Sequence, residues 1–388
     1  MSDLNTLFFE LIRVSIGTQT TLSRLPSEAE WEELFEMAVK QSLVGVCFSG
    51  LHDLGADSDE GHVRIGMSEE QFFNWMGMAV QINMRNNVVN EQCVTLQKRL
   101  AADGIKSSIL KGQGVAMLYG EELRGFRHSG DIDIYVDCGR EKAIEYARSI
   151  QGDVDWDYKH LHLKVFNAPS VVLNTEVEMH YVPEVFLNLR KNSKLQKWFK
   201  EPEVQSSMFQ VSSNMVCPSV AFNLFYILLH SYRHFLYEGV GMRQLMDYCF
   251  VLRASSNVPS SKIQEVKNTI ERFGMMRFTK GVMWIMKEVF GMSEQLLLVE
   301  PDEKEGRYIL SEVMTGGNFG HHDERLTIGV KGKFGAVMKI LRHSIDIGIH
   351  YPVDMIWAPI NILHHWCWKR YHMYFSSNKS SKESKESN

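Results

Sequence analysis

The chain has 388 residues, of which 44% are hydrophobic and 23% are charged, and its net charge is −5. This length predicts two or three domains or subdomains, and the composition is that of an ordinary globular protein. The negative charge argues against a protein that binds nucleic acids in general or anionic membranes. A local basic patch is still compatible with this net charge.

The cysteines and the apolar segments indicate the cellular compartment of the protein. The first ten residues contain no basic segment followed by an apolar run, so we expect no signal peptide. No apolar run approaches the roughly 20 residues of a membrane span. The six cysteines are scattered without a Cys-x-x-Cys pair, which favours reduced thiols over a zinc site or a disulfide framework. We therefore expect a soluble cytoplasmic protein that does not bind membranes.

Residues 1–95 are predicted to form an N-terminal helical region. A capping-box pattern at 27–30 precedes apolar residues at helical spacing over 31–39. A second helix is predicted over 68–102, where Asp103-Gly104 ends it with glycine at the C′ position. Nothing in this region has catalytic spacing, so we expect it to serve packing.

The pattern then changes, and a compact α/β core is predicted over 96–200. Short apolar segments alternate there with helical patterns and turn signals. The expected elements are a strand over 105–110, a helix over 112–118, a strand over 131–136, a helix over 141–150, and strands over 160–166 and 171–181 with a turn at 167–170.

Helical patterns return after this core and predict a C-terminal helical domain over 201–375. A Gly-Val-Gly joint at 239–241 separates its first two helices. Residues 376–388 contain only Ser, Asn, Lys and Glu and are expected to form a disordered tail. The expected helices cover 220–235, 243–252, 260–291, 301–314 and 332–350, followed by an aromatic-rich helix from 357 to 375.

The strand that begins after Gly130 carries two carboxylates on one face. Side chains alternate along a strand, so Asp131 and Asp133 share a face about 7 Å apart at the backbone. The other face carries Ile132 and Ile134, which would anchor the strand in a core. Mg²⁺ prefers carboxylate oxygens together with substrate phosphates. This pattern therefore predicts a metal site whose carboxylate ligands are held in place by a buried strand.

A second acidic strand can complete this cluster. Over 175–181, Glu176, Glu178 and His180 share one face. If this strand lies beside the Asp131/Asp133 strand, one of its glutamates supplies a third carboxylate. Two metal ions about 3.5–4 Å apart then activate a hydroxyl nucleophile and stabilise the leaving oxygen. The alternative is a solvated polar face on a sheet.

Five further side chains have more than one interpretation. Lys111 and Arg127 flank the acidic strand and would neutralise phosphate charge, or they are surface cations. His230 and His234 are one helical turn apart without the His-Glu-x-x-His pattern of a zinc site, so packing is the simpler role and a nucleotide contact the alternative. Arg243, likewise one turn from Asp247, most simply forms an ion pair with it.

These motifs resemble the uncharacterised nucleotidyltransferase family of bacterial proteins, which belongs to the DNA polymerase beta-like nucleotidyltransferase superfamily. Their order and spacing match, and the resemblance covers most of the chain. The matching blocks are Leu110-Lys111-Gly112, Leu118-Tyr119-Gly120, Arg127-x-x-Gly130-Asp131-Ile132-Asp133, Val177-Glu178-Met179-His180, His234-Phe235 and Gly239 through Asp247.

The resemblance implies an α+β fold, in which a nucleotidyltransferase-like mixed-sheet core is flanked by N-terminal and C-terminal helical regions. It implies that a glycine turn holds nucleotide phosphates and that three carboxylates hold the metal ions and are catalytic. The superfamily usually has Gly-Ser at this turn and Asp as the third carboxylate, whereas this chain has Gly112-Gln113 and Glu178. The predicted catalytic and metal-binding residues are Asp131, Asp133 and Glu178, and the predicted nucleotide-binding residues are Lys111, Gly112, Gln113, Arg127, Gly130, His234 and Arg243.

The predicted function is transfer of a nucleoside monophosphate from an NTP such as ATP to a hydroxyl or phosphate group of a small molecule or a protein. Two Mg²⁺ ions, or Mn²⁺ in their place, are the expected cofactors. One alternative is a degenerate fold that binds a nucleotide or a partner protein without turnover, which Gln113 favours and the retained carboxylates disfavour. Another is a template-free polymerase on RNA ends, which the acidic net charge disfavours.

Overall fold

The computed structural model describes residues 3–371 except 57–60, 152–153, 165, 169–170, 187, 213, 318–344, 346 and 362. The predicted tail and most of the helix predicted over 332–350 lie outside the described residues. None of the helices described is both long and apolar enough to cross a membrane.

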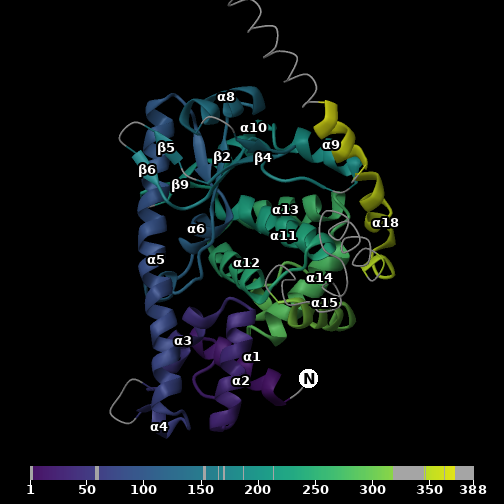
Figure 1. The fold of residues 1–388 in the computed structure, drawn as a ribbon. Helices are drawn as coiled ribbons and strands as arrows, with labels where there is room; N and C mark the ends of the chain where they lie inside the picture. Colours follow the sequence, from purple (N-terminus) through teal and green to yellow (C-terminus); the bar gives the residue numbers. More distant parts are fainter. Residues whose placement is uncertain are drawn as a thin grey trace, which may run out of the picture.

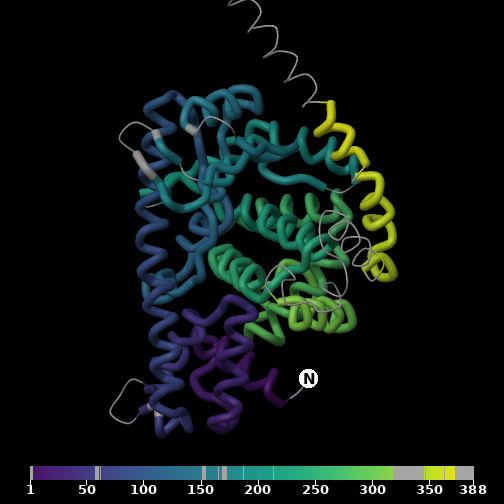
Figure 2. The backbone as a smooth tube through the Cα atoms, in the orientation of Figure 1, coloured from purple at the N-terminus to yellow at the C-terminus, as the bar shows by residue number. Residues whose placement is uncertain are grey.

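A single long helix, α5 (Glu69–Ala102), connects the two ends of the molecule (Figures 1 and 2). Its first half packs through Trp75 and Ile82 into the large helical core, and its second half packs through Cys93 and Leu96 into the core beneath the sheet. The predicted capping box is present at the start of α2, and a second capping box begins α5. The other N-terminal helices are α1 (Asp3–Ser15), α2 (Glu28–Lys40), α3 (Val44–Asp53) and α4 (Gly61–Arg64).

The central sheet has the strand order β1-β2-β7-β4-β3. Only β2 and β7 run parallel, while β1/β2, β4/β7 and β3/β4 are antiparallel. This mixed sheet between helical regions confirms the predicted α+β class. Its strands are β1 (Ser107–Ile109), β2 (Ile132–Val136), β3 (Asp155–Trp156), β4 (His160–Leu163) and β7 (Val177–His180), and α6 (Lys111–Ala116), α7 (Glu121–Arg124) and α8 (Arg140–Gln151) lie between them in sequence.

The strands predicted over 160–166 and 171–181 are each divided in two. β5 (Phe166–Ala168) and β6 (Val171–Leu173) form a separate hairpin, and only β4 and β7 join the central sheet. At the second break, the backbone N–H of Thr175 donates to Gln92 Oε1 of α5 at 3.2 Å. A helix from outside the strand pair therefore satisfies the backbone at this break, which a strand pattern alone does not reveal.

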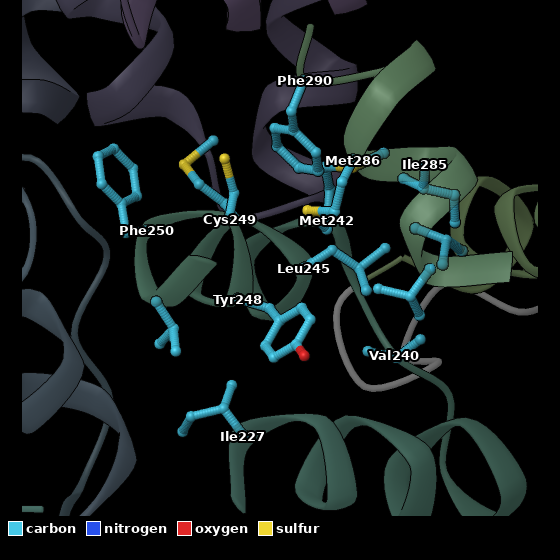
Figure 3. Close-up of a cluster of buried hydrophobic side chains, with 14 of the residues drawn as sticks. Ile227, Val240, Met242, Leu245, Tyr248, Cys249, Phe250, Ile285, Met286 and Phe290 are labelled. Carbon is cyan, nitrogen blue, oxygen red and sulfur yellow. The ribbon is translucent and has the colours of Figure 1, made fainter. Parts of the chain in front are cut away.

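The C-terminal helices form the largest part of the helical core. Figure 3 shows α12 with Met242, Leu245 and Cys249 facing Ile285 and Phe290, and all five side chains are buried. The helix predicted over 260–291 is interrupted at Gly274, whose φ of +68° ends its first half as glycine does at a C′ position. These elements are α9 (Leu189–Trp198), α10 (Pro202–Met208), β8 (Gln210–Ser212), β9 (Met215–Cys217), α11 (Val220–Tyr237), α12 (Met242–Ala254), η1 (Ser255–Asn257), α13 (Ser260–Arg272), α14 (Met276–Glu288), η2 (Glu294–Leu296), α15 (Glu303–Gly316) and α18 (Pro352–Met355).

The last described segment, helical over 357–361 and 363–371, lies against the edge strand β3 and the turn that follows it. The rings of Trp156 and Trp368 meet edge to face with centroids 5.5 Å apart. His365 hydrogen-bonds Asp157, and Lys369 lies 3.7 Å from Asp155. Trp368 of this segment therefore packs against the protein. The domain boundary predicted between residues 95 and 96 falls inside α5. The domain boundaries that the sequence indicates stay predictions.

Candidate functional site

The parallel pairing of β2 with β7 places the acidic residues side by side. Asp133 is the direct register partner of Glu178. Asp131 immediately precedes β2, where the backbone N–H of Ile132 donates to the carbonyl of Glu176 at 2.9 Å. The two acidic strands therefore lie side by side, which was the condition for a third carboxylate, and Glu178 rather than Glu176 is the partner of Asp133.

Asp133 is buried and compensated by two side chains. Lys111 Nζ lies 2.5 Å and His180 Nε2 2.9 Å from the same oxygen, Oδ1. Burial acts to raise the pKa of Asp133, but the Lys111 ammonium and the His180 hydrogen bond outweigh it and hold the pKa well below its usual range. Asp133 is therefore charged in the folded protein.

Asp131 lacks comparable compensation. Burial, followed by the nearby charges of Asp133 and Glu178, raises the pKa of Asp131 to about 6. Three carboxylates at one end of a strand pair are a set of oxygen donors that suits a hard divalent cation, and such a cation would relieve their repulsion. The donor set on this part of the sheet thus fits the magnesium ions that the sequence predicted.

The predicted phosphate-binding turn follows β1. Lys111 and Gly112 have φ values of +28° and +32°, the left-handed region that favours glycine and is unusual for lysine. This backbone turns Lys111 toward Asp133. Gln113 does not join it, because its side-chain amide donates to Asn90 Oδ1 of α5 at 2.6 Å.

A cavity of about 430 Å³ lies between the central sheet and helices α11 and α12. It collects nine of the ten predicted site residues and omits Gln113. The nine are Lys111, Gly112, Arg127, Gly130, Asp131, Asp133, Glu178, His234 and Arg243.

Arg127 lines this cavity but is held by a residue of α12. Its Nε and Nη2 donate to the two carboxylate oxygens of Asp247, both at 2.7 Å, and both side chains are buried. Tyr119 donates its hydroxyl to Asp247 at 2.7 Å as well. Asp247 is thus paired with an arginine 120 residues earlier, whereas the sequence pattern indicated Arg243. Arg243 itself donates from Nη1 to the carbonyl of His128 at 2.9 Å.

His230 and His234 engage acidic partners. His230 Nδ1 lies 2.9 Å from Glu184 Oε2, and His234 Nδ1 lies 2.7 Å from Glu238 Oε2. Burial, then the charge of Arg233, lowers the pKa of His234 to about 4 despite Glu238. The hydrogen-bonded interpretation of these histidines therefore agrees with their geometry, and the nucleotide contact of His234 stays a prediction.

Sequence reasoning missed a buried charge cluster on the far wall of the cavity. Glu184 is fully buried, with Arg233 Nε at 3.0 Å and Lys159 Nζ at 3.7 Å. Burial acts to raise the pKa of Glu184, but Arg233 and Lys159 outweigh it and hold the pKa well below its usual range. Nothing in the local pattern marks these residues, since each comes from a different segment.

Sequence reasoning also gave no role to the two histidines of β4. His160 and His162 line the same cavity, beside Glu178. Their His-x-His spacing on a strand was a usable signal, because residues two apart on a strand share a face.

Comparison with known families gives one match. Residues 27–291 match the model of a family described as uncharacterised nucleotidyltransferase. No curated protein and no solved structure matches the chain.

Proposed function

The chain belongs to the uncharacterised nucleotidyltransferase family, and on this premise we propose that it transfers a nucleoside monophosphate from an NTP to a small-molecule hydroxyl or phosphate. The observation that carries the proposal is the register of β2 and β7. It sets Asp133 opposite Glu178, with Asp131 one residue before the strand, at a cavity that also contains several buried cations.

The carboxylates Asp131, Asp133 and Glu178 would hold the two Mg²⁺ ions. When bound, such ions neutralise phosphate charge and lower the barrier to in-line displacement at phosphorus. The protein's own contribution is positioning, because the carboxylates are fixed on paired strands rather than on loops.

The cations of the cavity would bind the triphosphate. Lys111 lies on the positive-φ turn directly beside Asp133, so its ammonium can move from the carboxylate to a phosphate over a short distance. Arg243 is the cation of α12 next to the acidic strand, and its donors fit phosphate oxygens. Burial, then the charge of Arg127, lowers the pKa of Arg243 to about 10, so Arg243 still carries its charge at neutral pH.

The acceptor would enter from an adjoining cavity of about 220 Å³. Asp157, Lys159, Arg233 and Glu238 line both cavities, so the two cavities lie side by side with these side chains between them. The remaining walls carry the aromatic rings of Tyr158, Phe186, Tyr237 and Trp368. A space of this size lined by rings suits a small organic molecule and excludes a duplex or a folded protein surface.

The test is an incorporation assay with labelled NTPs and Mg²⁺, in which a metabolite extract, purified protein and RNA are offered as acceptors. Label transfer to a small molecule with release of pyrophosphate is expected, and Glu178→Gln should abolish it. Glu176→Gln is the matched control, because Glu176 lies two residues before Glu178 and directly before β7 but is not the register partner of Asp133. Labelling of RNA alone, or full activity of Glu178→Gln, would refute the proposal.

A second candidate is a nucleotide-binding module without turnover. It is favoured by the 2.5 Å ion pair that engages Asp133 with Lys111 and by the amide of Gln113 at the position where the superfamily has serine. Binding of NTP with Mg²⁺ but no pyrophosphate release with any acceptor would support it.

A further inference from the structure

β4 brings two histidines to the acidic strand β7. In the antiparallel register, His162 is the partner of Glu178 and His160 is the partner of His180. Since side chains two residues apart share a face, all four of these side chains point to one side of the sheet.

The two β4 histidines and Glu178 are close enough to bind one ion together. The Nε2 atoms of His160 and His162 are 2.9 Å apart. Glu178 Oε1 lies 3.9 Å from His160 Nε2 and 3.7 Å from His162 Nδ1. Two nitrogens that bind one ion at about 2.1 Å and at right angles are themselves about 3 Å apart, so the observed separation, which is also that of an N–H···N hydrogen bond, suits two ligands of a common ion.

His160 is enclosed, with its side chain 11% exposed. Its Nε2 is the ring nitrogen that faces His162 Nε2 and Glu178 Oε1. Among the described residues, its Nδ1 is buried without a hydrogen-bond partner, so no hydrogen bond at that nitrogen orients the ring. Nε2 is therefore the nitrogen of His160 that a metal ion would take, beside His162 and Glu178.

Glu178 stands between this group and the predicted magnesium site. Its Oε2 lies 3.2 Å from His180 Nε2, on the side of Asp133, while its Oε1 faces His160 and His162. One carboxylate therefore offers a separate oxygen to each of two neighbouring ligand groups, which are Asp133/Glu178/His180 and His160/His162/Glu178.

We propose that His160, His162 and Glu178 form a binding site for a first-row transition-metal dication such as Mn²⁺, Co²⁺ or Zn²⁺. Imidazole nitrogens suit these metals, whereas Mg²⁺ takes oxygen ligands, so the ligand chemistry separates this site from the carboxylate site. The proposal goes beyond the nucleotidyl transfer proposed above and does not depend on it, because metal binding is measurable without a nucleotide.

The test is titration of the metal-free full chain with Co²⁺, followed by its visible absorption, and with Mg²⁺, followed by calorimetry. The wild type is expected to bind Co²⁺ more tightly than Mg²⁺. His162→Gln should weaken Co²⁺ binding at least about tenfold and leave Mg²⁺ binding within about twofold, because loss of a nitrogen ligand affects only the metal that prefers it. His52→Gln, an exposed histidine of α3, is the control and should change neither affinity.

Equal affinities of the wild type for the two metals, or unchanged Co²⁺ binding by His162→Gln, would overturn the proposal. Pulsed EPR of Mn²⁺ bound to the wild type provides a readout that needs no variant, and it should show couplings to two imidazole nitrogens. Their absence would also overturn the proposal. Metal binding as expected in a protein that transfers no nucleotide would refute only the proposed function.

Discussion

The pair formed by Arg127 and Asp247 supports a quantitative prediction. It joins the loop before β2 to α12 through two hydrogen bonds of 2.7 Å, and the two side chains are 5% and 8% exposed. Arg127→Met would leave the Asp247 carboxylate buried with Tyr119 as its remaining close donor. Removal of one partner from a buried pair costs about 3–5 kcal/mol, because the other charge stays desolvated. We therefore expect Arg127→Met to lower the free energy of unfolding by this amount.

The assay is equilibrium urea unfolding followed by tryptophan fluorescence. The double variant Arg127→Met/Asp247→Leu should recover most of the loss, since replacing a whole buried pair by apolar side chains is often close to neutral. Arg307→Met is the control, because its partner Glu303 is exposed and surface pairs contribute little. A loss below about 1 kcal/mol in Arg127→Met, the range of surface pairs, would refute the reasoning. A changed NTP affinity without loss of stability would instead make Arg127 a phosphate ligand.

Three further predictions concern the site and its edge. Asp133→Asn should abolish transfer while Glu176→Gln retains most of it, as measured by pyrophosphate release; comparable activities would remove Asp133 from the catalytic set. Lys111→Ala should weaken NTP binding but strengthen Mg²⁺ binding in calorimetry, because the ammonium no longer competes for the carboxylate; losses of both affinities would contradict this. The Asp157 hydrogen bond raises the pKa of His365, so protonated His365 stabilises the docked C-terminal helix at low pH and this contribution is lost as the pH rises through the folded-state pKa. Burial acts to raise the pKa of Asp157, but the hydrogen bonds from His365 and from the backbone N–H of Tyr158 together outweigh it and lower the pKa to about 2, so Asp157 stays charged at every pH above its ordinary value of 3.8. The protection factors for hydrogen exchange over 363–371, which correct for the intrinsic rise of exchange with pH, should therefore fall as the pH rises above 6.5 in the wild type but not in His365→Gln, and an equal fall in both would contradict the assignment.

The features that the sequence predicted well depend on local rules. The capping boxes at the starts of α2 and α5 form within four residues, so their pattern alone is enough to place both helix starts. The shared face of Asp131 and Asp133 follows from the alternation of side chains along a strand. The sequence left the adjacency of the two acidic strands as a condition for a third carboxylate, and the register of β2 and β7 fulfils it.

The features that the sequence did not predict depend on contacts between distant segments. The strand predicted over 171–181 is interrupted around Thr175, whose backbone N–H donates to Gln92 of α5 instead of to a neighbouring strand. No strand pattern contains that information. Gln113 was expected at the phosphate turn, but Asn90 draws its side chain toward α5. Asp247 was expected to pair one helical turn away, yet a bidentate arginine from the loop before β2 reaches it.

By itself, the sequence determined the class of the fold, the two acidic strands and the side of each strand that carries the carboxylates. These follow from periodicity and from residue chemistry over a few neighbouring positions. Only the tertiary structure decided which charges neutralise one another, as with Glu184 among Lys159 and Arg233, and which histidines of β4 face Glu178. The physical reason is that the energy of a buried charge depends on its neighbours in space, and folding brings those neighbours from segments that lie far apart in the chain.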